Sequence, residues 1–142
     1  MLTIVTGPPC SGKSTYIAQR AKFGHIIIDL DRIALALTTE DTPHHGYHHG
    51  IRWVAMAARQ AALDAAIKQH HNGATVWAID TDPSPKRREF YRRAGGRVVD
   101  LDPGIETVLA RAHGQRPDHV IEYIREWYTA HPPSPPTRSR QW

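Results

Sequence analysis

Apolar and polar residues follow two different patterns along the chain, one typical of strands and one typical of helices. Short runs rich in Ile, Val and Leu, such as Leu2–Thr6 and Thr75–Ile79, have the length and composition of buried strands. Longer segments between such runs carry apolar residues at helical spacing, as from Ile51 to about His70, where Val54 and Ala58 lie one turn apart. Strands that alternate with helices predict an α/β fold, in which helices cover a parallel sheet.

Turn and capping residues mark where the expected elements begin and end. Asn72-Gly73 is a signal for the C-terminus of a helix, and Ser84 can cap a helix that has Pro85 at its first position. The expected strands are Leu2–Thr6, His25–Asp29, Thr75–Ile79 and Arg97–Leu101. The expected helices run from Lys13 to about Lys22, from Leu30 to about Leu37, from Ile51 to about His70, from Pro85 to Gly95-Gly96, from about Ile105 to Ala112 and from Asp118 to Thr129.

The length of 142 residues fits one domain, which we assign to residues 1–131. Residues 132–142, with the sequence PPSPPTRSRQW, are rich in proline and have no apolar periodicity, so we expect an extended or disordered tail. Hydrophobic residues make up 40% of the chain and charged residues 23%, a composition that indicates a soluble globular protein and excludes the collagen-like and disordered classes.

Three features of the sequence favour a cytoplasmic location. No apolar run approaches the roughly 20 residues of a membrane span, so no membrane partner is expected. The N-terminus lacks the basic leader of a signal peptide. The single cysteine, Cys10, has no partner for an internal disulfide, which agrees with a reducing compartment.

The formal net charge of +4 favours polyanionic partners such as nucleotides or nucleic acid. Much of the excess comes from Lys86-Arg87-Arg88, Arg92-Arg93 and the tail residues Arg138 and Arg140. A solvated basic helix face with a basic tail explains the same charges equally well, so both interpretations stay open.

The strongest chemical signal is the sequence GPPCSGKST directly after the first expected strand. It matches G-x-x-x-x-G-K-[ST] at every fixed position and precedes an expected helix, the context in which this motif binds nucleoside triphosphates. In such a loop, backbone N–H groups converge on phosphate oxygens, the lysine follows the terminal phosphate and the serine hydroxyl ligates Mg²⁺. The candidate ligands of ATP, or of another nucleoside triphosphate, are Gly7, Pro8, Pro9, Cys10, Ser11, Gly12, Lys13, Ser14 and Thr15.

A second group of polar residues, Asp29-Leu30-Asp31-Arg32, follows the second expected strand. The carboxyl ends of parallel strands meet at one edge of the sheet, so Asp29 is expected near the phosphates. A kinase needs a carboxylate there to take the proton of an acceptor hydroxyl. Arg32 could hold a phosphate or a ring of the substrate. Asp31 is a further substrate-binding candidate, although a cap of the short helix explains it equally well.

Two later segments complete the candidate site. Asp80 ends the third expected strand, where a carboxylate commonly holds the Mg²⁺ shell directly or through water, and Thr81 lies at the same edge as a substrate-binding candidate. Arg111 and Arg116 flank the sequence AHGQ and predict a mobile lid around residues 111–117, whose arginines stabilise transition-state charge. Taken alone, both arginines are also ordinary partners of a helix end.

These segments together resemble the P-loop kinases of the nucleotide-kinase superfamily, most closely the polynucleotide 5′-hydroxyl kinase-like proteins of phages, which are AAA-type ATP-binding proteins. The resemblance covers Leu2 to about Thr129 and is carried by GPPCSGKST, Asp29-x-x-Arg32, IDTDPSP and VVDLDPGIETVLARAHGQRP. It implies a P-loop NTPase fold, a three-layer α/β/α sandwich whose small parallel sheet of about four strands has the first strand in the middle.

The resemblance also implies roles for individual residues. In the family, the carboxylate that matches Asp29 is the general base, and the arginine that matches Arg32 engages the substrate. The side chains that match Lys13, Arg111 and Arg116 contact the transferring phosphate. Two departures are evident: the chain has no room for the phosphatase domain of bifunctional members, and Asp29-x-Asp31 also occurs in related small-molecule kinases.

The expected function is that of an ATP- and Mg²⁺-dependent kinase, which transfers the γ-phosphate to an alcohol group of a nucleic acid in the phage or bacterial host cytoplasm. Two alternatives stay open. The acceptor could be a nucleoside, a nucleotide or a hydroxymethylated base in DNA. Alternatively, the chain could be an ATP-binding accessory ATPase without an acceptor of its own.

Four histidines gather in the segment His44–His49, between the second and third expected helices. Such a cluster suggests a metal site, but neither a cysteine nor an obvious acid completes it. A loop that faces the substrate and an exposed polar loop are the other two interpretations.

Overall fold

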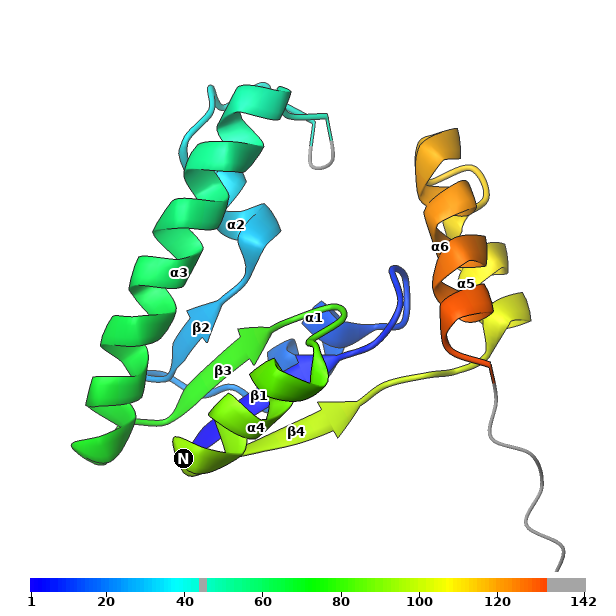
Figure 1. Ribbon diagram of the computed structural model, residues 1–142. Coiled ribbons are helices and arrows are strands. Elements are labelled where there is room, and N and C mark those ends of the chain that lie inside the picture. The colour runs from blue at the N-terminus through cyan, green and yellow to red at the C-terminus, as the bar shows by residue number, and fades with distance from the viewer. Residues whose placement is uncertain (44–45, 133–142) are drawn as a thin grey trace, which may run out of the picture.

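The computed structural model describes residues 1–43 and 46–132 of the chain. Each strand is followed by one or two helices in this part of the chain, as Figure 1 shows. The strands are β1 (Leu2–Thr6), β2 (Ile26–Ile28), β3 (Val76–Ile79) and β4 (Gly96–Asp100). The helices are α1 (Lys13–Ala18), α2 (Leu30–Ala36), α3 (His49–His71), α4 (Pro85–Arg93), α5 (Ile105–Ala112) and α6 (Asp118–Ala130). The tail expected at residues 132–142 lies outside the described residues, except for its first residue.

The four described strands form one parallel sheet in the order β2-β3-β1-β4. All five residues of β1 are buried, because β1 pairs with β3 on one side and with β4 on the other. Continuous apolar runs are typical of such strands, since both of their faces are covered. The α/β class, the four parallel strands and the interior position of the first strand are therefore confirmed.

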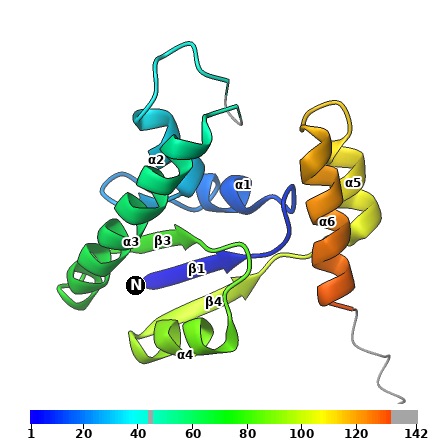
Figure 2. The ribbon, with the colours of Figure 1, turned by 45° about the horizontal axis from the view of Figure 1, so that its top comes forward.

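Helices pack on both faces of the sheet, an arrangement compatible with a three-layer sandwich. Leu63 and Ala66 of α3 and Tyr91 of α4 pack with Leu2, Ile4 and other side chains of one face. Ile17 of α1 packs on the opposite face, with Val5 and Trp77. Figure 2 shows α1 and α4 on opposite sides of the sheet.

The hairpin of α5 and α6 lies beyond the carboxyl end of the sheet, on the side where the chain leaves β1 (Figures 1 and 2). Its own core consists of Val108, Ala112 and Ile124, and the partly buried Cys10 packs against it. The Tyr128 hydroxyl donates a hydrogen bond to Asp102, which follows β4. The hairpin is therefore attached both to the end of β4 and to the loop after β1.

Element boundaries differ from the sequence-based expectations at a few positions. The first helix ends at Ala18 rather than near Lys22, because Arg20 N–H already bonds to the carbonyl of Ile17, a tighter turn that closes the helix. Conversely, α3 begins at His49, two residues before the expected start, because the ring of His48 caps it by accepting from Gly50 N–H. The cap by Ser84 with Pro85 at the first helical position is confirmed.

No helix within residues 1–43 and 46–132 is long and apolar enough to cross a membrane.

Candidate functional site

The loop from Gly7 to Ser14 connects β1 with α1 and has an unusual backbone. Gly7, Cys10 and Gly12 have φ values of 133°, 62° and 95°. Cys10 is the one described residue other than glycine with positive φ, a strained conformation for an L-residue. No described acceptor is bonded to the backbone N–H groups of Cys10, Gly12, Lys13 and Ser14. The loop therefore presents a set of unpaired donors, as an anion-binding loop requires.

Lys13 folds its side chain back over this loop. Its Nζ donates to the carbonyl oxygens of Gly7 at 2.8 Å and Pro8 at 2.6 Å. Burial lowers the pKa of Lys13 from 10.5 to about 8, and the positive charge of Arg116 acts in the same direction, whereas the charges of Asp29 and Asp31 oppose it. Lys13 Nζ also donates to the Ser11 hydroxyl at 3.5 Å, and a partly buried ammonium held by these neutral groups is poised to bind an anion.

Gly7 is required by the packing of the loop as well as by its φ value. A Cβ at this position would lie 2.1 Å from the backbone oxygen of Leu101, whereas a Cβ on Gly73, which also has positive φ, would meet nothing within 4 Å. Gly7→Ala is therefore expected to lower the free energy of unfolding by about 3 kcal/mol or more, against about 1 kcal/mol for Gly73→Ala. Urea denaturation measures both losses, and equal losses would contradict this view of the loop.

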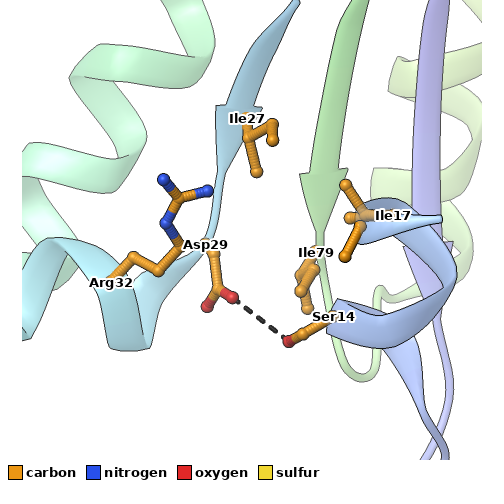
Figure 3. Close-up of a pocket in the computed structure, with 7 residues that line it drawn as sticks. Ser14, Ile17, Ile27, Asp29, Arg32 and Ile79 are labelled. Carbon is orange, nitrogen blue, oxygen red and sulfur yellow. Dashed lines mark hydrogen bonds between the residues drawn. The ribbon is translucent and has the colours of Figure 1, made fainter. Parts of the chain in front are cut away.

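Asp29 faces the loop from the end of β2. Its Oδ2 accepts a hydrogen bond of 3.2 Å from the Ser14 hydroxyl, and its Oδ1 accepts one of 3.0 Å from Asp31 N–H. The N-cap of α2 is therefore Asp29, and the alternative that Asp31 caps this helix is wrong. The Asp29 side chain is buried, with 8% of the residue exposed. The loop and the strand-end carboxylate, far apart in sequence, therefore meet in one place, as Figure 3 shows.

A pocket of about 200 Å³ opens beside this contact. Its walls are mostly aliphatic, and its polar groups come from the two elements that face each other in Figure 3. The lining residues are Ser14, Ile17, Ala18, Ile27, Asp29, Arg32 and Ile79. The pocket thus combines a carboxylate, a hydroxyl and a guanidinium with apolar walls, which suits a small organic group that carries a hydroxyl.

Arginines surround the loop and the pocket. Arg111 at the end of α5 donates to the carbonyl oxygen of Cys10 at 3.2 Å, and Arg116 lies near enough to influence the pKa of Lys13. Neither these two side chains nor Arg32 has a carboxylate partner in the described part of the chain. Guanidinium groups that no described carboxylate neutralises, beside unpaired amides, favour a bound anion with several charges. Movement of residues 111–117 as a lid stays a prediction.

Asp80 lies on the other side of the sheet edge. Its Oδ2 accepts from Arg87 Nε at 3.0 Å and from the Tyr91 hydroxyl, and Arg59 lies 3.9 Å away. Asp80 does not contact Ser14 in this arrangement, so its role as a magnesium ligand stays a prediction. Thr81 touches the loop through its backbone, because its carbonyl oxygen accepts from Gly7 N–H at 3.1 Å.

The alternation of side chains along a strand explains why Asp29 and Asp80 point to different faces of the sheet. Successive side chains of a strand point to opposite faces. Ile79 packs on the α1 face, so Asp80, one residue later, points to the face covered by α3 and α4. The pairing of Ile28 with Ala78 places Asp29 level with Ile79, and both line the pocket on the α1 side.

Sequence reasoning missed the aliphatic walls of the pocket and Tyr47, whose hydroxyl donates to Asp31 Oδ1 at 2.7 Å. The aliphatic walls could have been predicted, because side chains alternate between the two faces along each expected strand. No motif around Tyr47 in the sequence indicated its contact with Asp31. In the histidine segment, His48 caps α3 and His49 accepts from Trp53 Nε1, whereas His44 and His45 lie outside the described residues. Among residues 1–43 and 46–132, no three His, Cys, Asp or Glu side chains form a metal-binding group.

A comparison of the sequence with models of known protein families and with curated proteins found no match.

Proposed function

We propose that the chain is a P-loop kinase that uses ATP and Mg²⁺ to phosphorylate a hydroxyl group of a nucleic acid. The observation that carries the proposal is the hydrogen bond between Ser14 and Asp29, because it joins the GPPCSGKST loop to a buried carboxylate inside one pocket. A nucleotide-binding loop alone would fit many activities. The adjacent carboxylate supplies the group that a kinase needs on the acceptor side.

The loop fits the triphosphate of ATP. Its unpaired N–H groups supply donors, and Lys13 can exchange the carbonyl oxygens of Gly7 and Pro8 for phosphate oxygens. Arg111 and Arg116 add positive charge from the far side of the loop. The Ser14 hydroxyl is a suitable oxygen ligand for Mg²⁺, and Asp80 would contribute through water once its carboxylate turns away from Arg87 and Tyr91.

Each residue has a defined task in the proposed reaction. Mg²⁺-bound ATP supplies the phosphoryl group, and ADP is the leaving group. Asp29 accepts the proton of the acceptor hydroxyl while the hydroxyl oxygen bonds to the γ-phosphorus and the bond to the β,γ-bridging oxygen breaks. Lys13, Arg111 and Arg116 stabilise the charge that develops on the transferring group. Arg32 holds the acceptor in the pocket beside Asp29.

Incubation with γ-labelled ATP and a panel of acceptors tests the proposal. The panel contains a 5′-hydroxyl oligonucleotide of DNA, one of RNA, free nucleosides and nucleotides, and DNA with hydroxymethylated bases. We expect label in an oligonucleotide, dependent on Mg²⁺. Label only in a nucleoside or nucleotide would make the chain a small-molecule kinase, and label only in the hydroxymethylated base would move the acceptor site within the polymer. Release of inorganic phosphate without a labelled acceptor would contradict the kinase and favour an accessory ATPase.

A further inference from the structure

We propose that Tyr47 is a positioning residue of the acceptor side, which acts through Asp31 on the first turn of α2. The proposal rests on the proposed function, because it assigns Asp29 and Arg32 to the acceptor. Tyr47 lies between α2 and α3, and its hydroxyl donates to Asp31 Oδ1 at 2.7 Å across 16 residues of sequence. The contact joins a segment outside the pocket to the turn that carries two of the pocket's polar residues.

A continuous set of hydrogen bonds leads from Tyr47 to the loop. The hydroxyl of Tyr47 holds the side chain of Asp31, whose own N–H donates to Asp29 Oδ1 at 3.0 Å. Asp29 in turn accepts from Ser14 through its other oxygen. Both oxygens of Asp29 are therefore oriented by neighbours, and the residue that orients one of them is itself held by Tyr47.

Tyr47 also separates the roles of the two carboxylates. Asp31 lies close enough for its negative charge to raise the pKa of Lys13, so the orientation of its carboxylate affects the charge beside the loop. The Tyr47 hydroxyl draws the Asp31 carboxylate toward α3, where Arg52 lies near the same hydroxyl. Asp29 is thereby left as the carboxylate that meets the acceptor.

The Tyr47 hydroxyl stays protonated and can therefore donate its hydrogen bond to Asp31 at neutral pH. Burial and the hydrogen bond and charge of Asp31 raise the pKa of Tyr47 to about 12, so the phenol stays protonated throughout the neutral range. A hydrogen bond from a neutral phenol to a carboxylate is stronger than one between two neutral groups. Its loss should therefore be measurable in a single substitution.

The test measures transfer kinetics and the binding of a fluorescent 5′-hydroxyl oligonucleotide by anisotropy for Tyr47→Phe. We expect the KM and the dissociation constant for the oligonucleotide to rise about tenfold, while the KM for ATP stays unchanged and the thermal midpoint of unfolding falls by a few degrees, the cost of one charge-assisted hydrogen bond. Tyr16→Phe is the matched control, because it removes a tyrosine hydroxyl for which no hydrogen bond is found in the described part of the chain. In an Asp31→Asn background, Tyr47→Phe should have a smaller effect, since the two residues act as one unit.

The outcomes separate this proposal from the kinase proposal. Unchanged acceptor constants in Tyr47→Phe, with active wild-type protein, would overturn the role of Tyr47 and leave the kinase intact. Equal rises in the constants for ATP and for the oligonucleotide would show a general structural role and also overturn it. If the wild-type protein binds the oligonucleotide without transferring phosphate, the kinase proposal fails and the anisotropy data alone decide on Tyr47. If it neither binds nor phosphorylates any acceptor, both proposals fail.

Discussion

Asp29→Asn is expected to lower kcat for phosphoryl transfer by about 10²- to 10⁴-fold, the range typical of the loss of a general base. The amide keeps the size of the side chain: its oxygen can still accept from Asp31 N–H, and its NH2 group can donate to the Ser14 hydroxyl oxygen, so the pocket should keep its shape. The dissociation constant for ATP should therefore change little. Single-turnover assays with labelled ATP, combined with nucleotide-binding titrations, measure the two effects separately.

The contact with Ser14 offers a second explanation for such a loss, which the same variant can test. A carboxylate 3.2 Å from the serine of this motif could serve the Mg²⁺ shell instead of the acceptor proton. In that case, a higher Mg²⁺ concentration should restore activity to Asp29→Asn, whereas the loss of a base is independent of Mg²⁺. Asp64→Asn, on the exposed side of α3, is the control and should retain full activity.

Lys13→Met should abolish measurable transfer and weaken ATP binding by about 10²-fold or more, because the variant removes the one cation that lies on the loop itself. The methionine side chain fills similar space without charge, so the chain should still fold. Lys68→Met, at an exposed position of α3, is the matched control and should bind ATP normally. Normal transfer by Lys13→Met would refute the assignment of the loop to the phosphate donor.

Lys13 should also make the free energy of unfolding depend on pH, which a comparison with Lys13→Met can reveal. Burial lowers the pKa of Lys13 to about 8 in the folded protein, against 10.5 as the ordinary value. Between these pH values the unfolded chain holds a proton that the folded chain has lost, so the free energy of unfolding rises with pH across this window. Below pH 8, Lys13 is charged in both the folded and the unfolded state, so the full cost of burying its charge lowers the free energy of unfolding.

Relative to Lys13→Met, the wild-type protein should therefore gain about 2 kcal/mol of unfolding free energy from pH 8 to pH 10.5. The tyrosines and the other lysines titrate in both proteins, so their contributions cancel in this difference. Urea denaturation at several pH values measures it. A difference that stays constant across the window would show that Lys13 is not held in its folded-back, desolvated position.

Local patterns predicted the elements well, because they depend on spacing and on turn residues that are adjacent in sequence. The expected limits of β1 and α5 agree with the structure to the residue, and the capping of α4 by Ser84 is confirmed. Errors fell on the ends that a tertiary or side-chain contact decides. The cap of α3 by His48 is an example, whereas α1 ends early through a local backbone turn; neither follows from apolar periodicity.

In the candidate site, too, features built from consecutive residues were predictable, and contacts between distant residues were not. The GPPCSGKST motif was visible in the sequence because its chemistry comes from consecutive residues, and its unpaired amides and folded-back lysine follow from that local loop. The approach of Arg111 to Cys10 joins residues 101 positions apart, so the sequence suggested a nearby arginine only through the pattern of a lid and not through this contact. Tyr47 had no motif of its own, so its contact with Asp31 was not foreseen.

By itself, the sequence determined the order and type of the elements, the loop after β1 and the acids that end β2 and β3. Only the tertiary structure decided which acid faces the loop. Both acids end strands of one parallel sheet, and β3 is the nearer neighbour of β1, yet Asp29 of the outer strand contacts Ser14. The reason is the alternation of side chains across the sheet: it points Asp29 to the α1 face and Asp80 to the opposite face, where Arg87 and Tyr91 bind it.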